Sequence, residues 1–273
     1  MSSDANALLD AMSRGIEIID LARPMVVGMP QSPNHPEFRL SMPRRHGDMI
    51  RDDGGSAAND LLVTGTHVGT HIDALGHVSH CGELYGGAKA DDVQRGGRLS
   101  SHGVERIDPI VARGVLVDVP ASLGREALGG GEEITPQHLA DAVAWSGVAP
   151  RPGDVVLVRS GWGSRWSDGP AFVGKDTGVP GVGEAGARWL ADHAPRAVGA
   201  DTIAFECLPA GRGHALLPAH RVLLVERGVN IIETLDLEVL SARRIHEFMF
   251  VLAPLSLVGA TGSPVRPLAV VNT

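Results

Sequence analysis

The chain has 273 residues, of which 43% are hydrophobic, so it can bury the core of one large globular domain or two small ones. Asp and Glu outnumber Lys and Arg by 32 to 24, and the resulting net charge of −8 argues against nucleic acid or an anionic membrane as a partner. Two cysteines exclude a disulfide-rich secreted scaffold and favour a reducing, cytoplasmic compartment.

The first part of the chain predicts one strand, a long loop and a surface flap. Residues 1–10 lack a basic start and an apolar run, so they predict no signal peptide. Residues 16–21 (IEIIDL) are β-branched enough for a strand, whereas the prolines of residues 24–36 predict a loop. Residues 44–59 are rich in charge and glycine and predict a surface loop or flap, after which residues 61–64 resume a strand.

Further along, apolar strands alternate with helices. Thr135 is a suitable N-cap for a helix that Pro136 begins and Gly147 ends. A Gly-, Trp- and Ser-rich loop is expected over residues 160–169. The other expected strands cover residues 115–119, 154–159, 197–201 and 229–233, and the other expected helices cover residues 184–193 and 220–228. This alternation indicates a mixed α/β domain with at least one parallel pair of strands.

The domain organisation follows from the absence of a repeat or a linker in the sequence. We expect one domain over residues 1–273, with residues 1–15 as a flexible or oligomer-contacting N-terminal arm. Residues 248–260 form the longest uncharged apolar stretch, but it is shorter than the roughly 20 residues of a membrane-spanning helix. It therefore predicts a buried strand and its turn, and no membrane partner is expected.

The segment 64–80, TGTHVGTHIDALGHVSH, carries the clearest chemical pattern. His67, His71, Asp73 and His77 lie within eleven positions. Imidazole nitrogens and carboxylates are ligands of Zn²⁺ and Mn²⁺, and a catalytic site uses about three protein ligands while leaving room for water. A single histidine is more often structural, but four such groups at these spacings favour a metal site.

Neither regular element brings the first three of these side chains together. In a straight strand, His67 and His71 share a face but lie about 13 Å apart, and a straight helix turns Asp73 away from them. We therefore expect a strand that ends at His67 and bends at Gly69, where the missing Cβ frees the backbone and clears space beside the metal. The Thr70 hydroxyl is then placed to orient a ligand.

The pattern His67-x-Gly69-Thr70-His71-x-Asp73-x-x-x-His77 resembles the signature of the metal-dependent hydrolases often called putative cyclases. That family includes bacterial kynurenine formamidases and isatin hydrolases. The resemblance covers most of the chain, because further segments occur in the family's order. These segments are IEIIDL and GMP near the start, VLVRSGW at 156–162, AVGADT at 197–202, HRVLLVERGVNIIE at 220–233 and APLSLVGATGSPVRPLAVV near the end.

The resemblance implies a swivelling β/β/α-type fold, a homodimer or homotetramer, and one or two Zn²⁺ or Mn²⁺ ions. It also implies roles for individual residues. His67, His71 and Asp73 would bind one metal, Glu233 would be a shared ligand, His220 would help to hold a second ion, and His77 would transfer protons.

The chain departs from the family pattern near the substrate. Leu75 stands where the family usually has proline, and the N-terminal loop has Ser32 in the region where the formamidases carry a tryptophan. Ser32, Arg159 and Trp162 are the candidate substrate-binding residues. These departures leave open whether the enzyme acts as an arylformamidase, as an isatin hydrolase or on another small amide.

The sequence therefore predicts hydrolysis of a non-peptide C–N bond in a formamide, lactam or cyclic amide by metal-activated water, with His77 as the acid and base. One alternative is a non-catalytic metal-binding member of the same fold, against which the spare His77 argues. The other is a non-haem iron oxygenase that uses His71, Asp73, His220 and Arg266, against which the helices between strands argue because such enzymes are jelly rolls.

Overall fold

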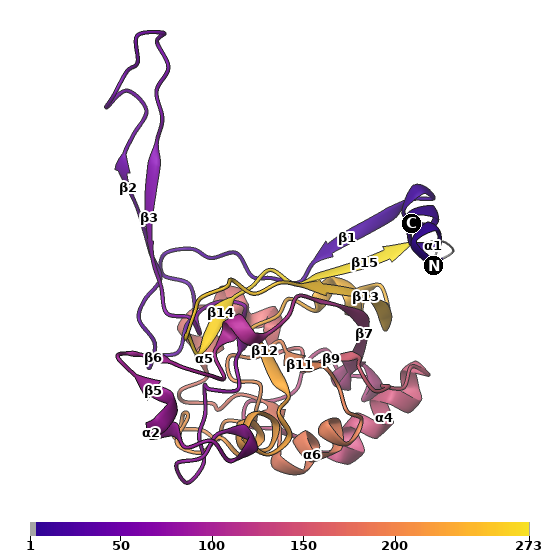
Figure 1. The fold of residues 1–273 in the computed structure, drawn as a ribbon. Coiled ribbons are helices and arrows are strands. Elements are labelled where there is room, and N and C mark those ends of the chain that lie inside the picture. Colours follow the sequence, from indigo (N-terminus) through magenta and orange to yellow (C-terminus); the bar gives the residue numbers. More distant parts are fainter. Residues whose placement is uncertain (1–3, 273) are drawn as a thin grey trace.

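A nine-stranded mixed sheet runs through the middle of the molecule (Figure 1), in the order β1-β15-β13-β7-β9-β11-β12-β4-β14. The computed structural model describes residues 4–272. The strands are β1 (Ile16–Asp20), β4 (His71–Asp73), β7 (Ile110–Asp118), β9 (Val155–Arg159), β11 (Ala197–Ala200), β12 (Asn230–Glu233), β13 (Glu247–Leu252), β14 (Gly262–Pro264) and β15 (Leu268–Asn272).

The centre of the sheet is parallel, since β7 pairs with β9, β9 with β11 and β11 with β12 in that sense. The strands on either side pair antiparallel. Strand β9 shows why the centre is parallel: Val155 to Val158 are all fully buried, as both faces of a covered parallel strand must be. The predicted mixed α/β domain is confirmed, and the jelly roll required by the iron-oxygenase alternative is absent from residues 4–272.

Each face of the sheet has its own core. Val156 and Val158 point into a cluster with Leu139 of α4 (Pro136–Ser146) and Leu190 of α6 (Glu184–Asp192). Their neighbours in β9 point into the opposite cluster, which contains Ile72 of β4, Leu240 of α8 (Glu238–Ala242) and Phe250 of β13. Successive side chains of a strand alternate between faces, so one short apolar run supplies both cores.

The predicted helices form close to their expected limits. Thr135 caps α4 through a bond from the His138 amide, and Gly147 ends it in the left-handed conformation with φ at 72°. The prediction of a loop over residues 160–169 is wrong for most of that range, because residues 162–168 form the 3₁₀ helix η3 (Trp162–Asp168). The remaining helical segments are α1 (Asp4–Ser13), α2 (Ala90–Val93), α3 (Val119–Ser122), α5 (Pro170–Val173), α7 (Pro218–His220), α8 (Glu238–Ala242), the 3₁₀ helices η1 (Tyr85–Gly87), η2 (Val104–Arg106) and η3 (Trp162–Asp168), and the π-helix η4 (Arg221–Arg227).

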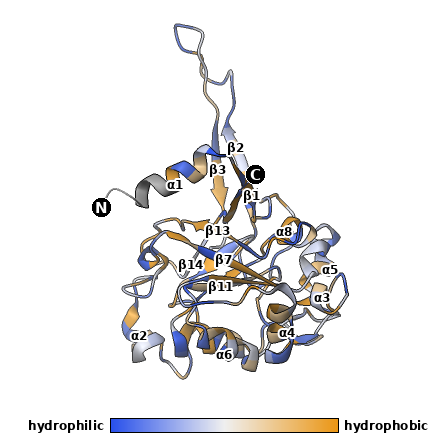
Figure 2. Cartoon of the chain, turned by 90° about the vertical axis from the view of Figure 1, so that its right-hand side faces the viewer, coloured by the Kyte–Doolittle hydropathy of each residue, from blue (hydrophilic) through white to orange (hydrophobic). Residues whose placement is uncertain are grey.

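The predicted flap is the tip of a hairpin that projects from the body of the molecule (Figures 1 and 2). Its strands are β2 (Arg39–Arg44) and β3 (Asn59–Val63), and every residue of both is exposed. Two smaller pairs complete the strands: β5 (Gln94–Arg95) with β6 (Arg98–Leu99), and β8 (Glu133–Ile134) with β10 (Gly181–Val182).

The expected N-terminal arm is helical where the structure describes it, because residues 4–13 form α1 ahead of β1 (Figure 1). Residues 1–3 of that arm lie outside the described residues. Among residues 4–272, no helix combines the length and the apolar character that a membrane span requires.

Candidate metal centre

Strand β4 lies between β12 and β14 and carries two of the predicted ligands. His71 and Asp73 are two residues apart, so their side chains share one face of the sheet, whereas Ile72 between them points into the core. Glu233 of β12 is directly opposite His71 in the antiparallel register. Cross-strand partners have neighbouring Cβ atoms, so this register places the Glu233 carboxylate beside the His71 imidazole.

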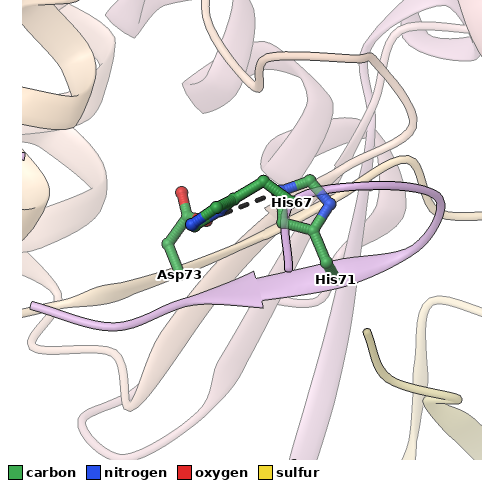
Figure 3. Close-up of side chains that lie close together, drawn as sticks. All are labelled: His67, His71 and Asp73. Carbon is green, nitrogen blue, oxygen red and sulfur yellow. Dashed lines mark hydrogen bonds and ion pairs between the residues drawn. The ribbon is translucent and has the colours of Figure 1, made fainter. Parts of the chain in front are cut away.

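The loop before β4 turns back so that His67 lies over the strand (Figure 3). His67 Nδ1 is 2.7 Å from Asp73 Oδ1, and His67 Nε2 is 2.8 Å from the hydroxyl of Thr261. The expected strand end at His67 is wrong, because His67 belongs to the loop and the strand begins at His71. A loop residue can approach Asp73 from above, which a residue of the same straight strand cannot do.

Gly69 permits this turn. Its φ is +69°, a conformation that residues with a Cβ rarely adopt. The predicted bend at Gly69 is therefore confirmed. The expectation that its missing Cβ clears space beside the metal is wrong. A Cβ at Gly69 would meet Met25 at 3.4 Å and Met29 at 3.6 Å, away from the imidazoles. The Thr70 hydroxyl does not orient a ligand either, because it donates to the backbone carbonyl of Thr234 at 2.7 Å.

The imidazoles of His71 and His220 are oriented by hydrogen bonds at Nδ1. His71 Nδ1 lies 2.8 Å from the carbonyl oxygen of Gly69, which can only accept, so Nδ1 carries the proton. His220 Nδ1 lies 2.6 Å from a carboxylate oxygen of Glu206. In both rings Nε2 is therefore the nitrogen left for a metal, as in a metal-ligating histidine.

Both Nε2 atoms face the same pair of carboxylates. His71 Nε2 is 3.5 Å from Asp73 Oδ1 and 3.4 Å from Glu233 Oε2. His220 Nε2 is 3.1 Å from Glu233 Oε1 and 3.6 Å from Asp73 Oδ2. Two imidazoles from different elements thus converge on two acids of adjacent strands. His220 ends α7, so a third segment of the fold closes the group.

Glu206 is a further acid at the centre, and it is not among the site residues that the sequence predicts. It is 1% exposed, and in addition to the His220 ring it accepts from the amides of His220 at 3.0 Å and Ala219 at 3.3 Å. It therefore caps the start of α7 and positions the imidazole at once. A local sequence pattern cannot predict this role, because Glu206 and His220 are fourteen positions apart.

His77 lies in the turn after β4, where its amide donates to the Ala74 carbonyl. Its ring stacks on His67 with centroids 3.8 Å apart and lies 6.2 Å from the ring of His220. Burial lowers the pKa of His77 to about 4, although the nearby Asp73 opposes that shift. The ring is therefore neutral at neutral pH and can accept a proton.

Both acids of the cluster are ionised at neutral pH. Burial alone would raise the pKa of Asp73, but the neighbouring imidazoles of His77, His67 and His220 hold it well below its usual range. Burial also opposes ionisation of Glu233, yet the adjacent imidazoles of His220 and His71 lower its pKa to about 2. A cation ligand must be in this deprotonated form.

The arrangement fits a divalent cation. Asp73 Oδ2 and Glu233 Oε1 are buried, and no hydrogen bond from another residue in the described range reaches either oxygen with acceptable geometry. Buried charged oxygens without partners are costly, so a cation is the natural partner. Two overlapping sets each place three ligand atoms within 4.8 Å of one another. The sets are His67, His71 and Asp73 (Figure 3), and Asp73, His77 and His220.

A cavity of about 250 Å³ opens onto the cluster. Its lining includes three residues that are not among the predicted site residues, Asn34, His35 and His214. The apolar part of the wall comes from Ile203, Ala204 and Leu217. The rest of the lining is Glu233 and the four imidazoles of His67, His71, His77 and His220.

Two predicted substrate-binding residues lie behind this wall. Ser32 is buried and its carbonyl accepts from the His35 amide, so it supports the turn that presents His35 to the cavity. Trp162 is buried, donates its indole N–H to the Phe172 carbonyl at 2.8 Å and packs with Ile203. Neither residue is part of the cavity lining, so their predicted contact with the substrate would have to be indirect.

Arg159 is also absent from the cavity, and its donors are already used. The guanidinium pairs with Asp118 at 3.0 Å and with Glu238 at 2.8 Å, and it also donates to the Glu126 carbonyl. Such a buried ion-pair group belongs to the scaffold. Arg266, offered for the oxygenase alternative, forms an exposed pair with Asp20 at 2.7 Å.

Comparison with known proteins bears on the whole chain. A family model described as "Putative cyclase" matches residues 19–207, a range that contains His67 to His77 and ends before His220. An isatin hydrolase of Roseibium aggregatum is 25% identical over 268 residues, which cover 95% of this chain and 94% of that protein.

Cyclase-like protein 3 of Oryza sativa subsp. japonica is 30% identical over 221 residues, or 78% of this chain. The matched part spans 66% of the length of that relative. A crystal structure described as a novel cyclase superposes with a TM-score of 0.84 at 28% identity, covering 97% of this chain and 92% of that one. The similarity in sequence and the similarity in fold thus indicate the same family.

Proposed function

Because this chain belongs to the putative cyclase family, we propose that it is a metal-dependent hydrolase that cleaves a non-peptide C–N bond in a formamide, lactam or cyclic amide. The observation that supports this most directly is the convergence of two oriented Nε2 atoms on two buried carboxylates that each keep an oxygen without a hydrogen bond. The isatin hydrolase relative supports the cyclic-amide class, since isatin contains a cyclic amide.

In this proposal His67, His71 and Asp73 hold one cation, Glu233 is shared, and His220 helps to hold a second ion when two are bound. Mixed imidazole and carboxylate donors suit Zn²⁺ and Mn²⁺. Such a cation supplies Lewis acidity, which increases the acidity of water and polarises a carbonyl oxygen.

The protein's own residues orient the substrate and move protons. His77 lines the cavity, and its ring nitrogens form no hydrogen bond with another side chain in the described part of the chain, so they are free to bond water or substrate. We assign to His77 the transfer of a proton from the attacking water to the departing nitrogen, a step that contributes about 10² to 10⁴ in rate. The apolar wall of Ile203, Ala204 and Leu217 excludes competing water from the organic part of the substrate.

The size of the cavity supports a small substrate. At about 250 Å³ it lies just below the range of about 300 to 1,000 Å³ that is typical of pockets for drug-sized ligands. The inner cavity by itself therefore suits the compact amide group of a small substrate.

The test combines metal analysis with turnover. Metal content would be measured by elemental analysis after loading with Zn²⁺ or Mn²⁺, and N-formylkynurenine, isatin and simple cyclic amides would be assayed. We expect Asp73→Ala and His71→Ala to lose metal and turnover together, while the exposed control Asp108→Asn keeps both. Full activity in metal-free Asp73→Ala would overturn the proposal. Correct metal loading without any hydrolysis would instead support the non-catalytic metal-binding alternative.

We further propose that the chain forms a homo-oligomer through the β2–β3 hairpin. The hairpin exposes Leu40, Met42, Leu61, Leu62 and Val63, each at about half of its accessible surface or more. A projecting strand pair with such a surface is an aggregation hazard unless another surface covers it. Light scattering after size exclusion would test this, since Leu40→Lys with Leu62→Lys should give monomers. An unchanged mass would refute the role of the hairpin.

A further inference from the structure

A second and larger pocket, of about 560 Å³, lies beside the metal-centre cavity. Its walls are residues 173–176, 208–209 and 211–215, and Pro33 and Asn34 close one side. Asn34 and His214 belong to the linings of both hollows, so the outer pocket begins where the inner cavity ends. A molecule whose reacting group lies at the metal centre can therefore extend past these two side chains.

The walls of the outer pocket are held in place by backbone contacts. The Gly211 amide donates to the Lys175 carbonyl at 3.0 Å, which joins the two wall segments. Gly174 has φ at +68°, and a Cβ there would collide with the Gly178 carbonyl. Gly178 in turn has φ at +75°, and a Cβ would lie 2.6 Å from the Leu208 carbonyl. The pocket therefore depends on close backbone packing that only glycine allows.

The lining combines an apolar floor with two cations. Val173, Leu208 and Pro209 supply the apolar surface. Lys175 and Arg212 are exposed, and neither forms an ion pair with another residue in the described range 4–272. The chain has two lysines, and the other one, Lys89, pairs with Glu83.

The charge of the pocket contrasts with the charge of the molecule. Asp176 is the acid among the lining residues, so with a neutral His214 the lining carries one net positive charge. The whole chain carries −8. A local excess of positive charge on an acidic protein, above an apolar floor, is suited to an organic anion.

We propose that this outer pocket is a subsite that binds the carboxylate end of an elongated substrate. This inference rests on the proposed amide hydrolysis and adds the substrate class to it. The scissile amide occupies the inner cavity, an apolar linker passes Asn34 and His214, and the carboxylate meets Lys175 and Arg212. Preference for such substrates follows from the subsite and not from the metal centre.

The test separates binding from turnover. Phenylbutanoate, which has no amide to cleave, and its uncharged counterpart phenylbutanamide would be titrated calorimetrically against the metal-loaded full chain. We expect tighter binding of the carboxylate, weakened roughly twofold to fivefold by Lys175→Gln and similarly by Arg212→Gln. Binding of phenylbutanamide should not change. Lys89→Gln, at the other lysine, is the matched control and should leave both ligands unaffected.

Turnover provides the second arm. A formanilide with a para-linked butanoate chain and its butanamide analogue would be compared by kcat/KM, and Lys175→Gln should reduce the preference for the charged substrate. Equal binding of the two phenylbutanoic derivatives, or a carboxylate preference that survives both substitutions, would overturn the subsite. If neither formanilide is hydrolysed but the calorimetry is as expected, formamide hydrolysis is refuted while the anion pocket is supported.

Discussion

Removal of the Glu206 carboxylate tests whether the metal centre depends on a residue that does not touch the metal. In Glu206→Ala the His220 ring and the amides of His220 and Ala219 all lose their acceptor. Each buried donor left without a partner costs about 1 to 2 kcal/mol, so the variant should be less stable by about 3 to 6 kcal/mol. Glu206→Gln keeps an acceptor of the same shape and should lose about 1 to 2 kcal/mol.

The effect on metal binding should be separable from the effect on stability. The carboxylate selects the His220 tautomer whose Nε2 faces Glu233 at 3.1 Å, so a ring without that bond presents the lone pair less often. Loss of such an orienting group typically weakens metal affinity about 10- to 100-fold. We expect that range for Glu206→Ala and a smaller loss for Glu206→Gln, whose amide oxygen still accepts from Nδ1.

The assay is competition with a chromophoric chelator, run at a temperature where circular dichroism shows each variant folded. Urea unfolding would give the change in stability. The control is Glu126→Gln, because Glu126 is an exposed acid that does not line the cavity. Wild-type metal affinity in folded Glu206→Ala would refute the positioning argument. An equal loss in the control would show that net charge, not orientation, governs binding.

Three further outcomes follow from the same geometry. Chelation should lower the melting temperature of the metal-loaded protein, Zn²⁺ or Mn²⁺ should restore it, and His71→Ala should show no such shift in differential scanning calorimetry, because only the native state holds the ion. Gly69→Ala should cost about 1 to 2 kcal/mol in urea unfolding, because its φ of +69° disfavours any Cβ, and an unchanged midpoint would contradict that origin. Arg159→Met should lower the free energy of unfolding by about 3 to 5 kcal/mol, because it leaves the buried Asp118 carboxylate without its ion pair. The metal content per folded molecule should stay the same. A selective loss of metal would instead place Arg159 at the metal centre.

Much of the sheet was predictable because its strands are encoded by short apolar runs. Residues 154–159 read as a buried strand, and β9 spans Val155–Arg159 with both faces covered. The cap and stop signals of α4 acted as expected at Thr135 and Gly147. The 3₁₀ helix η3 was missed because its Gly-, Trp- and Ser-rich sequence has no helical periodicity.

The sequence by itself determined the local part of the site. His67, Gly69, His71 and Asp73 lie within seven positions, so one turn and one short strand suffice to gather them, and the chemistry of these side chains points to a cation. Only the tertiary structure decided the rest. Glu206 lies beside His220, Arg159 is consumed by scaffold acids, and the cationic pocket adjoins the cavity, because these neighbours depend on how distant segments pack. Such packing is set by the whole core, and no spacing within a single segment records it.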